Sequence, residues 1–367
     1  MTLFLSLGAR VVVNVEALNM VEAIGNVVRH RKATVIYKIG DRYELRTVPV
    51  VSGEALRHAI QAALADIAVK MGLPVCKWCR MHEFVKHGVV VDQVIGDLDK
   101  YVEEYCGSGQ APEELCKRLE QEEGRPFERL AKVSLAEAER AVLKTCVVED
   151  VGGFLIPLET TVKRTSVLEV GYMVPAVEGD AIKYGFDVQF HTRHAPNAEA
   201  VVPGNVEPRP QSVYNVESSS AVYALSMNVE LGRIGVLSNC SGEGCVLEDR
   251  DKRVKAALLA IGEVLKGNVR VGGHWSSYKP LWAVDSAVAV VSSPLPMSVY
   301  PPVYENYVEE TVKLVEGNKK LWERAGLKGA AKVIALGKCV NGAECAKDVG
   351  EFLLKVFDAV EHDFAKG

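Results

Sequence analysis

The sequence predicts an α+β protein with a split ferredoxin-like core. A strand–helix–strand order opens the chain, and a second one begins near Ser218 after a long insertion. That order is the one expected of a ferredoxin-like fold whose halves are separated by inserted segments. We therefore divide the chain into the first half of the core (1–74), a helical insertion (75–150), a β-rich, thumb-like arm (151–217) and the second half of the core with C-terminal helices (218–367).

The first half of the core has a strand, a hairpin and a helix. Residues 10–18 predict a strand buried on both faces, because three valines follow one another and no turn residue occurs before Asn19. Residues 34–39 and 43–48 flank a Gly-Asp pair and predict a hairpin. Ser52 is a candidate N-cap of a helix with apolar residues at helical spacing, which Gly72-Leu-Pro74 ends.

The two insertions differ in composition. Residues 75–148 are helical and acidic in pattern, with amphipathic stretches at 89–105, 112–122 and 134–143, the last capped by Ser134. Short β-type runs follow, and Pro-rich and Gly-rich loops interrupt them. This composition favours an extended hairpin or arm over a compact core, with strands at 160–165, 168–174 and 184–190.

The second half of the core repeats the strand–helix–strand order. Residues 218–236 predict a strand that returns to the central sheet, and 251–265 predict a helix ended by Gly267-Asn268. Residues 283–291 predict an almost wholly apolar strand. A helix, a strand and a second helix then follow at 305–325, 331–336 and 344–364.

Bulk properties narrow the class of protein. Hydrophobic residues make up 48% and charged residues 25% of the 367, which is ordinary for a globular protein. No apolar run approaches the roughly 18 residues needed to cross a bilayer, and the first residues lack the basic flank of a secretory signal, so we expect a cytoplasmic protein without a membrane partner. A net charge of −5 argues against indiscriminate coating of nucleic acid, and the acid is concentrated between residues 97 and 150.

Residues 11–32 are the strongest candidates for binding. Arg29-His30-Arg31-Lys32 follow Gly25-Asn26, so basic side chains adjoin a flexible turn. A solvated charge run is the alternative interpretation. Amides on or after a core strand can bind ribose hydroxyls and base edges, which favours RNA, and this stretch offers Asn14, Asn19 and Asn26.

Ser52-Gly53 begins a predicted helix, and its unpaired N–H groups form a natural phosphate seat with Arg57 and His58 one turn later. An ordinary N-cap is the alternative.

The loop with His191, Arg193 and His194 contains the residue types that a ribonuclease uses for catalysis, because histidines can serve as acid and base while arginine stabilises the phosphorane. A surface histidine pair is the alternative there.

A later segment, Gly272-Gly273-His-Trp-Ser-Ser-Tyr-Lys279, combines flexible glycines with aromatic rings that can stack on bases and a lysine that can neutralise a phosphate. Core aromatics are the alternative.

Cys76, Cys79, His82 and His87 give a C-x2-C-x2-H-x4-H pattern, which supplies enough ligands for tetrahedral zinc. The pattern is compact and lacks a Gly-containing turn, which favours buried or oxidised thiols over zinc.

Taken in order, these segments resemble the DevR-type autoregulator family, whose members form the backbone of the archaeal type I-A CRISPR surveillance complex, Cascade. The resemblance rests on 11–32, Ser52-Gly53, the His191 loop, Ser219-Ser220-Ala-Val-Tyr-Ala-Leu225 with Arg233-Ile-Gly235, and 253–273. It implies an RNA-recognition-motif-like core whose copies polymerise as a helical filament along a CRISPR guide RNA. Target DNA then pairs with the displayed guide.

The resemblance also implies roles for residues. We expect guide RNA, target DNA through the guide, further copies of the chain and other Cascade subunits as partners, and neither a cofactor nor a catalytic residue. A metal-independent endoribonuclease using His191 and His194, and a transcriptional autoregulator, are the alternatives. The RNA-binding candidates are Asn14, Asn19, Asn26, Arg29, His30, Arg31, Lys32, Ser52, Gly53, Arg57, His58, Lys163, His191, Arg193, His194, Gly272, Gly273 and Lys279.

Six of the nine cysteines occur in pairs that each close a short, Gly-containing loop. Disulfides persist inside hyperthermophile cells, and an archaeal source fits the resemblance. The possible bridges are therefore Cys106–Cys116, Cys240–Cys245 and Cys339–Cys345, and reduced thiols remain the alternative.

Overall fold

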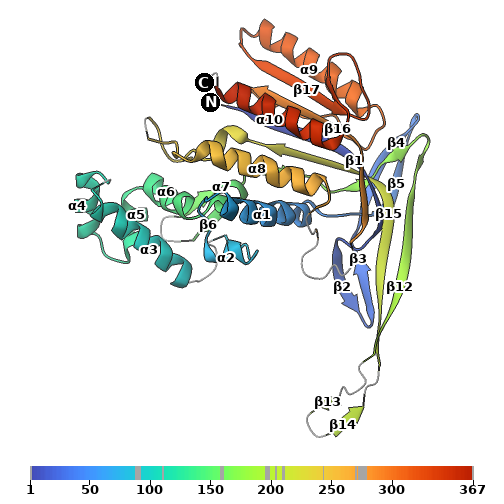
Figure 1. Ribbon diagram of the computed structural model, residues 1–367, viewed down its shortest axis with the longest axis horizontal. Coiled ribbons are helices and arrows are strands. Elements are labelled where there is room, and N and C mark those ends of the chain that lie inside the picture. The colour runs from blue at the N-terminus through green and yellow to red at the C-terminus, as the bar shows by residue number, and fades with distance from the viewer. Residues whose placement is uncertain are drawn as a thin grey trace.

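A mixed sheet runs through the middle of the molecule (Figure 1). The computed structural model describes residues 2–86, 92–109, 111–157, 161–194, 199–202, 205–208, 211–242, 244–268, 271 and 279–365. The sheet follows the order β18-β17-β16-β1-β15-β3-β2, and β8, β9 and β12 also pair with β15. Its strands are β1 (Phe4–Glu16), β2 (Met20–Ile24), β3 (Val27–His30), β8 (Leu168–Val170), β9 (Val174–Pro175), β12 (Tyr184–His194), β15 (Gln211–Val229), β16 (Leu281–Ser293), β17 (Ala330–Leu336) and β18 (Glu344–Ala346).

Both halves of the chain contribute to this sheet. β1 from the first half lies between β15 and β16 from the second, antiparallel to each. The expected strand at 10–18 therefore forms, but it begins earlier, at Phe4, and ends at Glu16. β1 is buried as far as Val13, and Asn14 and Val15 are exposed where it leaves the core. β15 is longer than expected at its start and stops at Val229, before a 3-10 turn, η1 (Leu231–Arg233).

Helices cover both faces of the sheet. α1 (Gly53–Lys70), α8 (Arg250–Leu265) and α10 (Val349–Ala365) share one hydrophobic core with the sheet, and α9 (Tyr307–Arg324) covers the other face beside β16 and β17. The apolar run of β16 follows from this arrangement. Ala287, Ala289 and Val291 lie in the core shared with α8 and α10, whereas Val288 and Val290 lie in the core beneath α9. A strand covered on both faces has no solvent side, so apolar residues need not alternate with polar ones.

Helices α2 to α7 form a group beside α1, on the far side of the molecule from β12 and the β2–β3 hairpin (Figure 1), and α2 and α7 also pack into the core around α1. Phe127, Leu130 and Val142 are fully buried in a core of their own there. α5 was not expected as a separate helix; Pro126 suits its first turn and Phe127 anchors it. The helices are α2 (Lys77–Arg80), α3 (Asp92–Gly107), α4 (Glu113–Gln121), α5 (Pro126–Val133), α6 (Leu135–Thr145) and α7 (Val147–Gly152).

Small two-stranded sheets complete the fold. The expected hairpin at 34–48 is β4 (Lys32–Ile39) with β5 (Arg42–Pro49), and β13 (Glu199–Val202) pairs with β14 (Asn205–Pro208). The remaining pairs are β6 (Phe154–Ile156) with β7 (Val162–Arg164) and β10 (Val177–Glu178) with β11 (Ala181–Ile182). Among the described residues, no helix is both long enough and apolar enough to cross a membrane.

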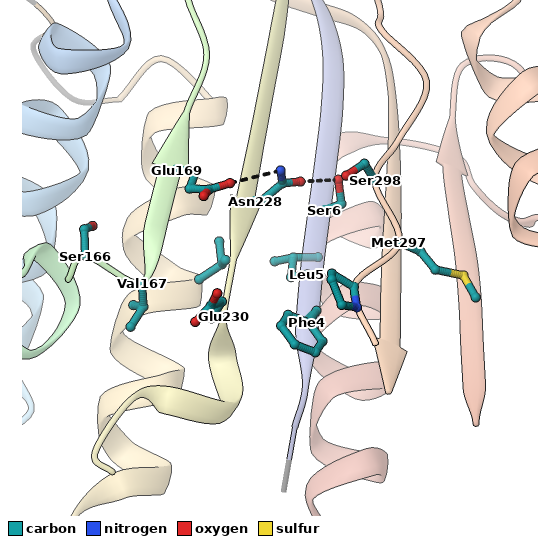
Figure 2. A pocket seen from close by; sticks show the side chains of 12 residues that line it. Phe4, Leu5, Ser6, Ser166, Val167, Glu169, Asn228, Glu230, Met297 and Ser298 are labelled. Carbon is teal, nitrogen blue, oxygen red and sulfur yellow. Dashed lines mark hydrogen bonds between the residues drawn. The ribbon is translucent and has the colours of Figure 1, made fainter. Parts of the chain in front are cut away.

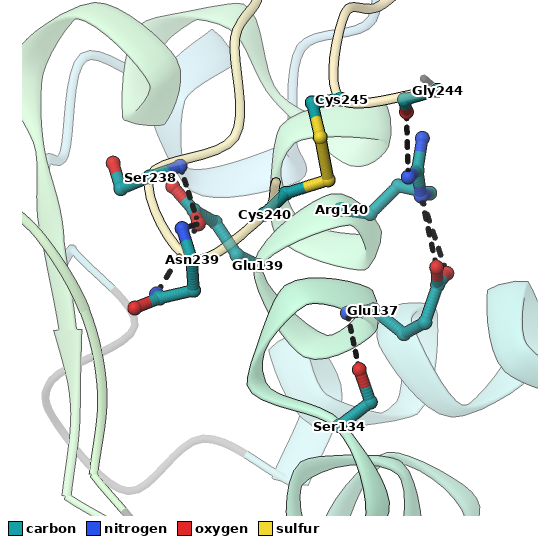
Figure 3. The surroundings of a disulfide bond; sticks show 9 residues. All are labelled: Ser134, Glu137, Glu139, Arg140, Ser238, Asn239, Cys240, Gly244 and Cys245. Carbon is teal, nitrogen blue, oxygen red and sulfur yellow. Dashed lines mark hydrogen bonds and ion pairs between the residues drawn. A yellow bond between two sulfur atoms is a disulfide. The ribbon is translucent and has the colours of Figure 1, made fainter. Parts of the chain in front are cut away.

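Disulfides and a buried ion network join these parts. Cys106–Cys116 links α3 to α4, Cys240–Cys245 closes a loop against α6, and Cys339–Cys345 closes the loop before β18. Figure 3 shows how the second loop docks: the backbone N–H groups of Ser238 and Asn239 donate to Glu139 Oε2 at 2.8 and 3.0 Å. The other oxygen of Glu139 accepts from Arg164, whose guanidinium also pairs with Asp150 at 2.6 Å. All three of these charged side chains are fully buried.

Candidate nucleic-acid interface

The basic stretch that the sequence singled out folds as a hairpin against the long strands of the arm. β2 and β3 are joined by a turn at Gly25-Asn26, and β3 runs parallel to β15. The backbone N–H of Asn215 donates to the carbonyl oxygen of Asn26 at 2.7 Å. β12 lies antiparallel along β15, so the hairpin and β12 both use β15 as their partner (Figure 1). Residues 20–30 and 184–194, far apart in the chain, thus share one surface.

Two exposed cations mark this surface. The side chain of Arg29 is 48% exposed and lies 3.9 Å from Glu22 on the neighbouring strand. The ammonium group of Lys32 lies 3.8 Å from Glu217 and 4.0 Å from the centre of the Phe186 ring. Exposed ion pairs of this kind are weak, so both cations can turn to an incoming phosphate at little cost.

An exposed apolar row runs along β12 beside these cations. Tyr184, Phe186, Val188 and Phe190 occupy alternate positions, and Phe190 is 67% exposed. Alternate residues of a strand point to the same face, so these side chains form one continuous stripe. Aromatic rings on an open strand can stack on bases of any sequence. The sequence alone does not reveal this feature, because the β-type run at 184–190 predicts a strand but not that its apolar face is open to solvent.

His191 points to the opposite face of β12. Its ring is stacked on Tyr214 of β15, with 5.1 Å between the ring centres and 19° between the planes. Arg193 and His194 continue β12, but their side chains lie outside the part of the chain that the structure describes. The structure therefore places His191 in the arm, as a stacked ring beside a tyrosine.

His30 and Asn19 are buried, so their side chains do not lie on the surface where the sequence predicts contacts with RNA. The ring of His30 lies 2.7 Å from a carboxylate oxygen of Glu16, which also accepts from the Tyr223 hydroxyl at 2.6 Å. Burial opposes a charged His30, but the hydrogen bond to Glu16 and its negative charge outweigh burial and raise the pKa of His30. Asn19 accepts a hydrogen bond from the backbone N–H of Ser52 at 2.8 Å.

The predicted phosphate seat at the start of α1 is closed. Ser52 caps the helix as expected, because its hydroxyl accepts from the Ala55 N–H at 3.2 Å, but Ser52 is buried. A β-carbon at Gly53 would lie 2.1 Å from the carbonyl oxygen of Val170 in β8. This close approach of α1 to the sheet requires glycine and leaves no room for a phosphate. Arg57 and His58 are half-buried one turn later, and His58 packs edge-on against Phe84 at 4.8 Å.

The other RNA-binding candidates are dispersed. Asn14 and Asn26 are exposed, at the end of β1 and in the hairpin turn, and Arg31 is half-buried. Lys279 is exposed just before β16, whose first residue pairs with Asn14. Lys163 is exposed on β7, which pairs with β6 and packs beside α6, so it belongs with the helical group and not with the arm. Gly272 and Gly273 lie outside the described residues.

The four-residue zinc pattern is not brought together. His82 lies 3.0 Å from Asp66 on α1, and His87 is outside the described residues. Cys76 and Cys79 instead approach Cys146, a residue that the local pattern did not include.

A surface hollow of about 220 Å³ lies at the ends of β1, β8 and β15 (Figure 2). Its polar groups bond to one another: the Ser6 hydroxyl donates to Asn228 at 2.7 Å, and Asn228 donates to Glu169 at 3.4 Å. Its described lining residues include no histidine, lysine or arginine. The hollow therefore offers neither a phosphate-binding cation nor an imidazole acid or base.

Comparisons with known proteins agree with the resemblance seen in the sequence. The family model described as "CRISPR-associated negative auto-regulator DevR/Csa2" matches residues 7–312. A Saccharolobus solfataricus protein named "CRISPR-associated aCascade subunit Cas7/Csa2 2" is 35% identical over 307 residues, which cover 83% of this chain and 84% of the relative. A second S. solfataricus protein, "CRISPR-associated protein Cas7/Csa2 1", is 33% identical over 82% of each chain.

More distant matches extend further along the chain. A Methanocaldococcus jannaschii protein named "CRISPR-associated protein Cas7/Cst2/DevR" is 25% identical over 97% of this chain and 99% of its own length. Among solved structures, a chain of a "CRISPR RNA-guided surveillance complex, pre-nicking" matches with a TM-score of 0.43 and 11% identity, covering 97% of this chain and 100% of that one.

Proposed function

The chain belongs to the DevR/Csa2 family of CRISPR-associated proteins, and on this premise we propose that it is a non-catalytic backbone subunit of a type I-A Cascade complex. Copies of it bind side by side along a CRISPR guide RNA and hold the guide for pairing with target DNA. The observation that carries the proposal is the surface where Lys32 lies over Phe186 in the exposed aromatic row of β12, with the exposed Arg29 on the hairpin that also borders β15. Cationic groups beside stacking platforms are what single-stranded RNA binding requires.

The surface suits a guide RNA whose bases must remain free to pair with the target. Arg29 and Lys32 can hold phosphates, and Phe186 and Phe190 can stack on bases irrespective of their identity. Sequence specificity then resides in base pairing between the guide and its target. The protein should accordingly bind RNA of any sequence with similar affinity.

The arrangement of the sheet supports an RNA-recognition-motif-like interpretation of the core. β1, α1, the β8–β9 pair, β15, α8 and β16 follow one another along the chain, and the sheet places them in the order β16-β1-β15 with β8 and β9 on the far edge of β15. A split ferredoxin-like fold has this strand order, with its two helices on one face. The long β12–β15 hairpin then corresponds to an arm inserted between the second and third core strands.

The RNA contact is tested through its salt dependence. If Arg29, Arg31 and Lys32 each neutralise one phosphate, the affinity for single-stranded RNA falls about twentyfold between about 50 and 200 mM salt. The R29A/K32A double variant should bind more weakly to every sequence and lose only about threefold over the same range. The control is Lys313→Ala, because Lys313 is also exposed and paired with a glutamate but lies on α9. Equal affinity and slope in wild type and double variant would remove this surface from the site.

The stacking contribution has a separate test. Phe190→Ala should lower RNA affinity by about fivefold to 150-fold, with an unchanged salt slope, because stacking is worth about 1–3 kcal/mol per base and involves no counterion release. Leu155→Ala is the control, since Leu155 is an exposed apolar residue on β6, outside the arm. A loss of affinity in both variants alike would point to a general effect on folding.

The non-catalytic assignment is tested with repeat RNA in EDTA. No cleavage is expected, and sustained cleavage that His191→Ala or His194→Ala abolishes would establish the endoribonuclease instead. Specific binding to one duplex DNA operator, without affinity for guide RNA, would establish the autoregulator. Electron microscopy of the protein with guide RNA should show helical filaments. The proposal also predicts that the protein, when isolated from the cytoplasm, carries guide RNA and other Cascade subunits with it.

A further inference from the structure

Three cysteines meet at the root of the helical group. Cys76 precedes α2, Cys79 lies within it, and Cys146 occupies the junction between α6 and α7. Their three sulfur atoms lie within 4.8 Å of one another. Cys79 and Cys146 are buried, and Cys76 is half-buried. The polypeptide leaves the core near Cys76 and returns at Cys146, so the cluster joins the two ends of this inserted group of helices.

The spacing of the sulfur atoms suits a tetrahedral metal ion. Zinc–thiolate bonds of about 2.3 Å place the sulfurs of a tetrahedral site about 3.8 Å apart. The observed cluster needs only a small contraction to reach that distance. The Cys79 N–H also lies 3.5 Å from the sulfur of Cys76 and orients it toward the cluster.

A carboxylate completes the set of ligands. Glu149 lies on α7, one turn after Cys146, and its Oε1 is 3.7 Å from the sulfur of Cys79. Glu149 is buried, with 2% of its surface exposed. Its carboxylate is thus held beside the Cys79 thiol in the interior of the protein. Three thiols with a carboxylate next to one of them match the sulfur and oxygen ligands of zinc.

We propose that Cys76, Cys79, Cys146 and Glu149 bind one zinc ion. Binding replaces the three thiol protons with the metal and releases those protons to solvent. Three thiolates, one carboxylate and Zn²⁺ carry a net charge of about −2. Lys86 supplies a nearby positive charge, because its amine lies 3.5 Å from the carbonyl oxygen of Gly152 at the end of α7.

The ion would act as a structural clamp. α2 and α7 both pack against α1, and a metal bond between them fixes the base of the helical group to the core. A ligand that binds the folded chain and not the unfolded one raises stability in proportion to the logarithm of its concentration over its dissociation constant. The clamp is independent of the RNA surface, because β12 and the β2–β3 hairpin contribute no ligand to it.

The site is tested with cobalt as a spectroscopic probe. The full chain is purified, treated with EDTA, and titrated with Co²⁺ under nitrogen. One equivalent should produce the thiolate-to-metal absorption and visible bands of tetrahedral cobalt, and Zn²⁺ should displace them. Cys146→Ser should weaken Co²⁺ binding by about a hundredfold or more. The control is His82→Ala, which should leave the titration unchanged because His82 contacts Asp66 instead.

Two further measurements guard against misfolding and oxidation. Glu149→Gln retains the three cysteines and should keep the thiolate absorption while weakening binding. Alkylation mapped by mass spectrometry should modify the half-buried Cys76 in the metal-free protein and spare it when zinc is present. Absence of the cobalt spectrum in the wild type, its persistence in Cys146→Ser, its loss in His82→Ala, or a disulfide within the cluster would each overturn the proposal.

Discussion

Replacing Arg164 with methionine should destabilise the protein more than any exposed arginine substitution. Arg164 donates six hydrogen bonds, which connect α6, α7 and the segment before α8. Its two carboxylate partners, Glu139 and Asp150, are fully buried and would remain without it. Removing one member of a buried ion network costs about 3–5 kcal/mol, because the remaining charge is left in the interior.

That loss converts to a measurable shift. A chain of 367 residues unfolds with an entropy near 0.8 kcal/mol/K, so the melting temperature should fall by about 4–6 °C. Differential scanning calorimetry at one protein concentration provides the measurement. Arg46→Met is the matched control: Arg46 lies 2.6 Å from Glu44, as close as Arg164 lies to Asp150, but it is exposed. The control should melt with the wild type, since many surface pairs contribute nothing measurable. Equal melting temperatures for both variants would refute the argument.

Three further predictions follow from individual side chains. Gly53→Ala should lower the melting temperature, because the new β-carbon would meet the Val170 carbonyl, and overpacking costs about 1–3 kcal/mol. Gly96→Ala should raise stability by about 0.5–1 kcal/mol, because this position in α3 has open space around it. The raised pKa of His30 means that its pair with Glu16 stabilises the fold fully below the unfolded pKa of about 6.5 and loses this contribution as pH rises through the folded pKa. Denaturation at several pH values should show this dependence in the wild type and lack it in His30→Gln.

Local signals in the sequence were sufficient for much of the fold. Ser52 predicted the start of α1, and Ser134 predicted the start of α6, because a serine hydroxyl before an apolar repeat has a defined partner three residues on. The Gly40-Asp41 pair predicted the β4–β5 hairpin for a similarly local reason. Each of these features depends on residues close together in the chain.

Features that depend on distant partners could not be predicted. The β2–β3 hairpin was read as a polar, cationic stretch, because its pairing with β15 joins residues almost 190 positions apart, as in Val27 with Asn215. The same limit explains why the predicted zinc pattern includes His82: it is close to Cys76 and Cys79 in the sequence, whereas Cys146 is close to them only in the folded chain. Ser52-Gly53 had the composition of a phosphate seat, and only the approach of Val170 shows that it is closed.

Under the proposed function, the pairing of the cations limits how tightly one copy of the chain can hold RNA. Arg29 and Lys32 each have a glutamate nearby, so a phosphate must displace Glu22 or Glu217 to bind. One copy of the chain therefore gains little from each cation, and its affinity for RNA should be modest. Copies that bind adjacent sites on one RNA add their contributions, since each later contact forms at a high effective concentration. If the proposed function is correct, weak single contacts combined along a filament should favour a long RNA over short fragments, although the net charge of the chain is −5.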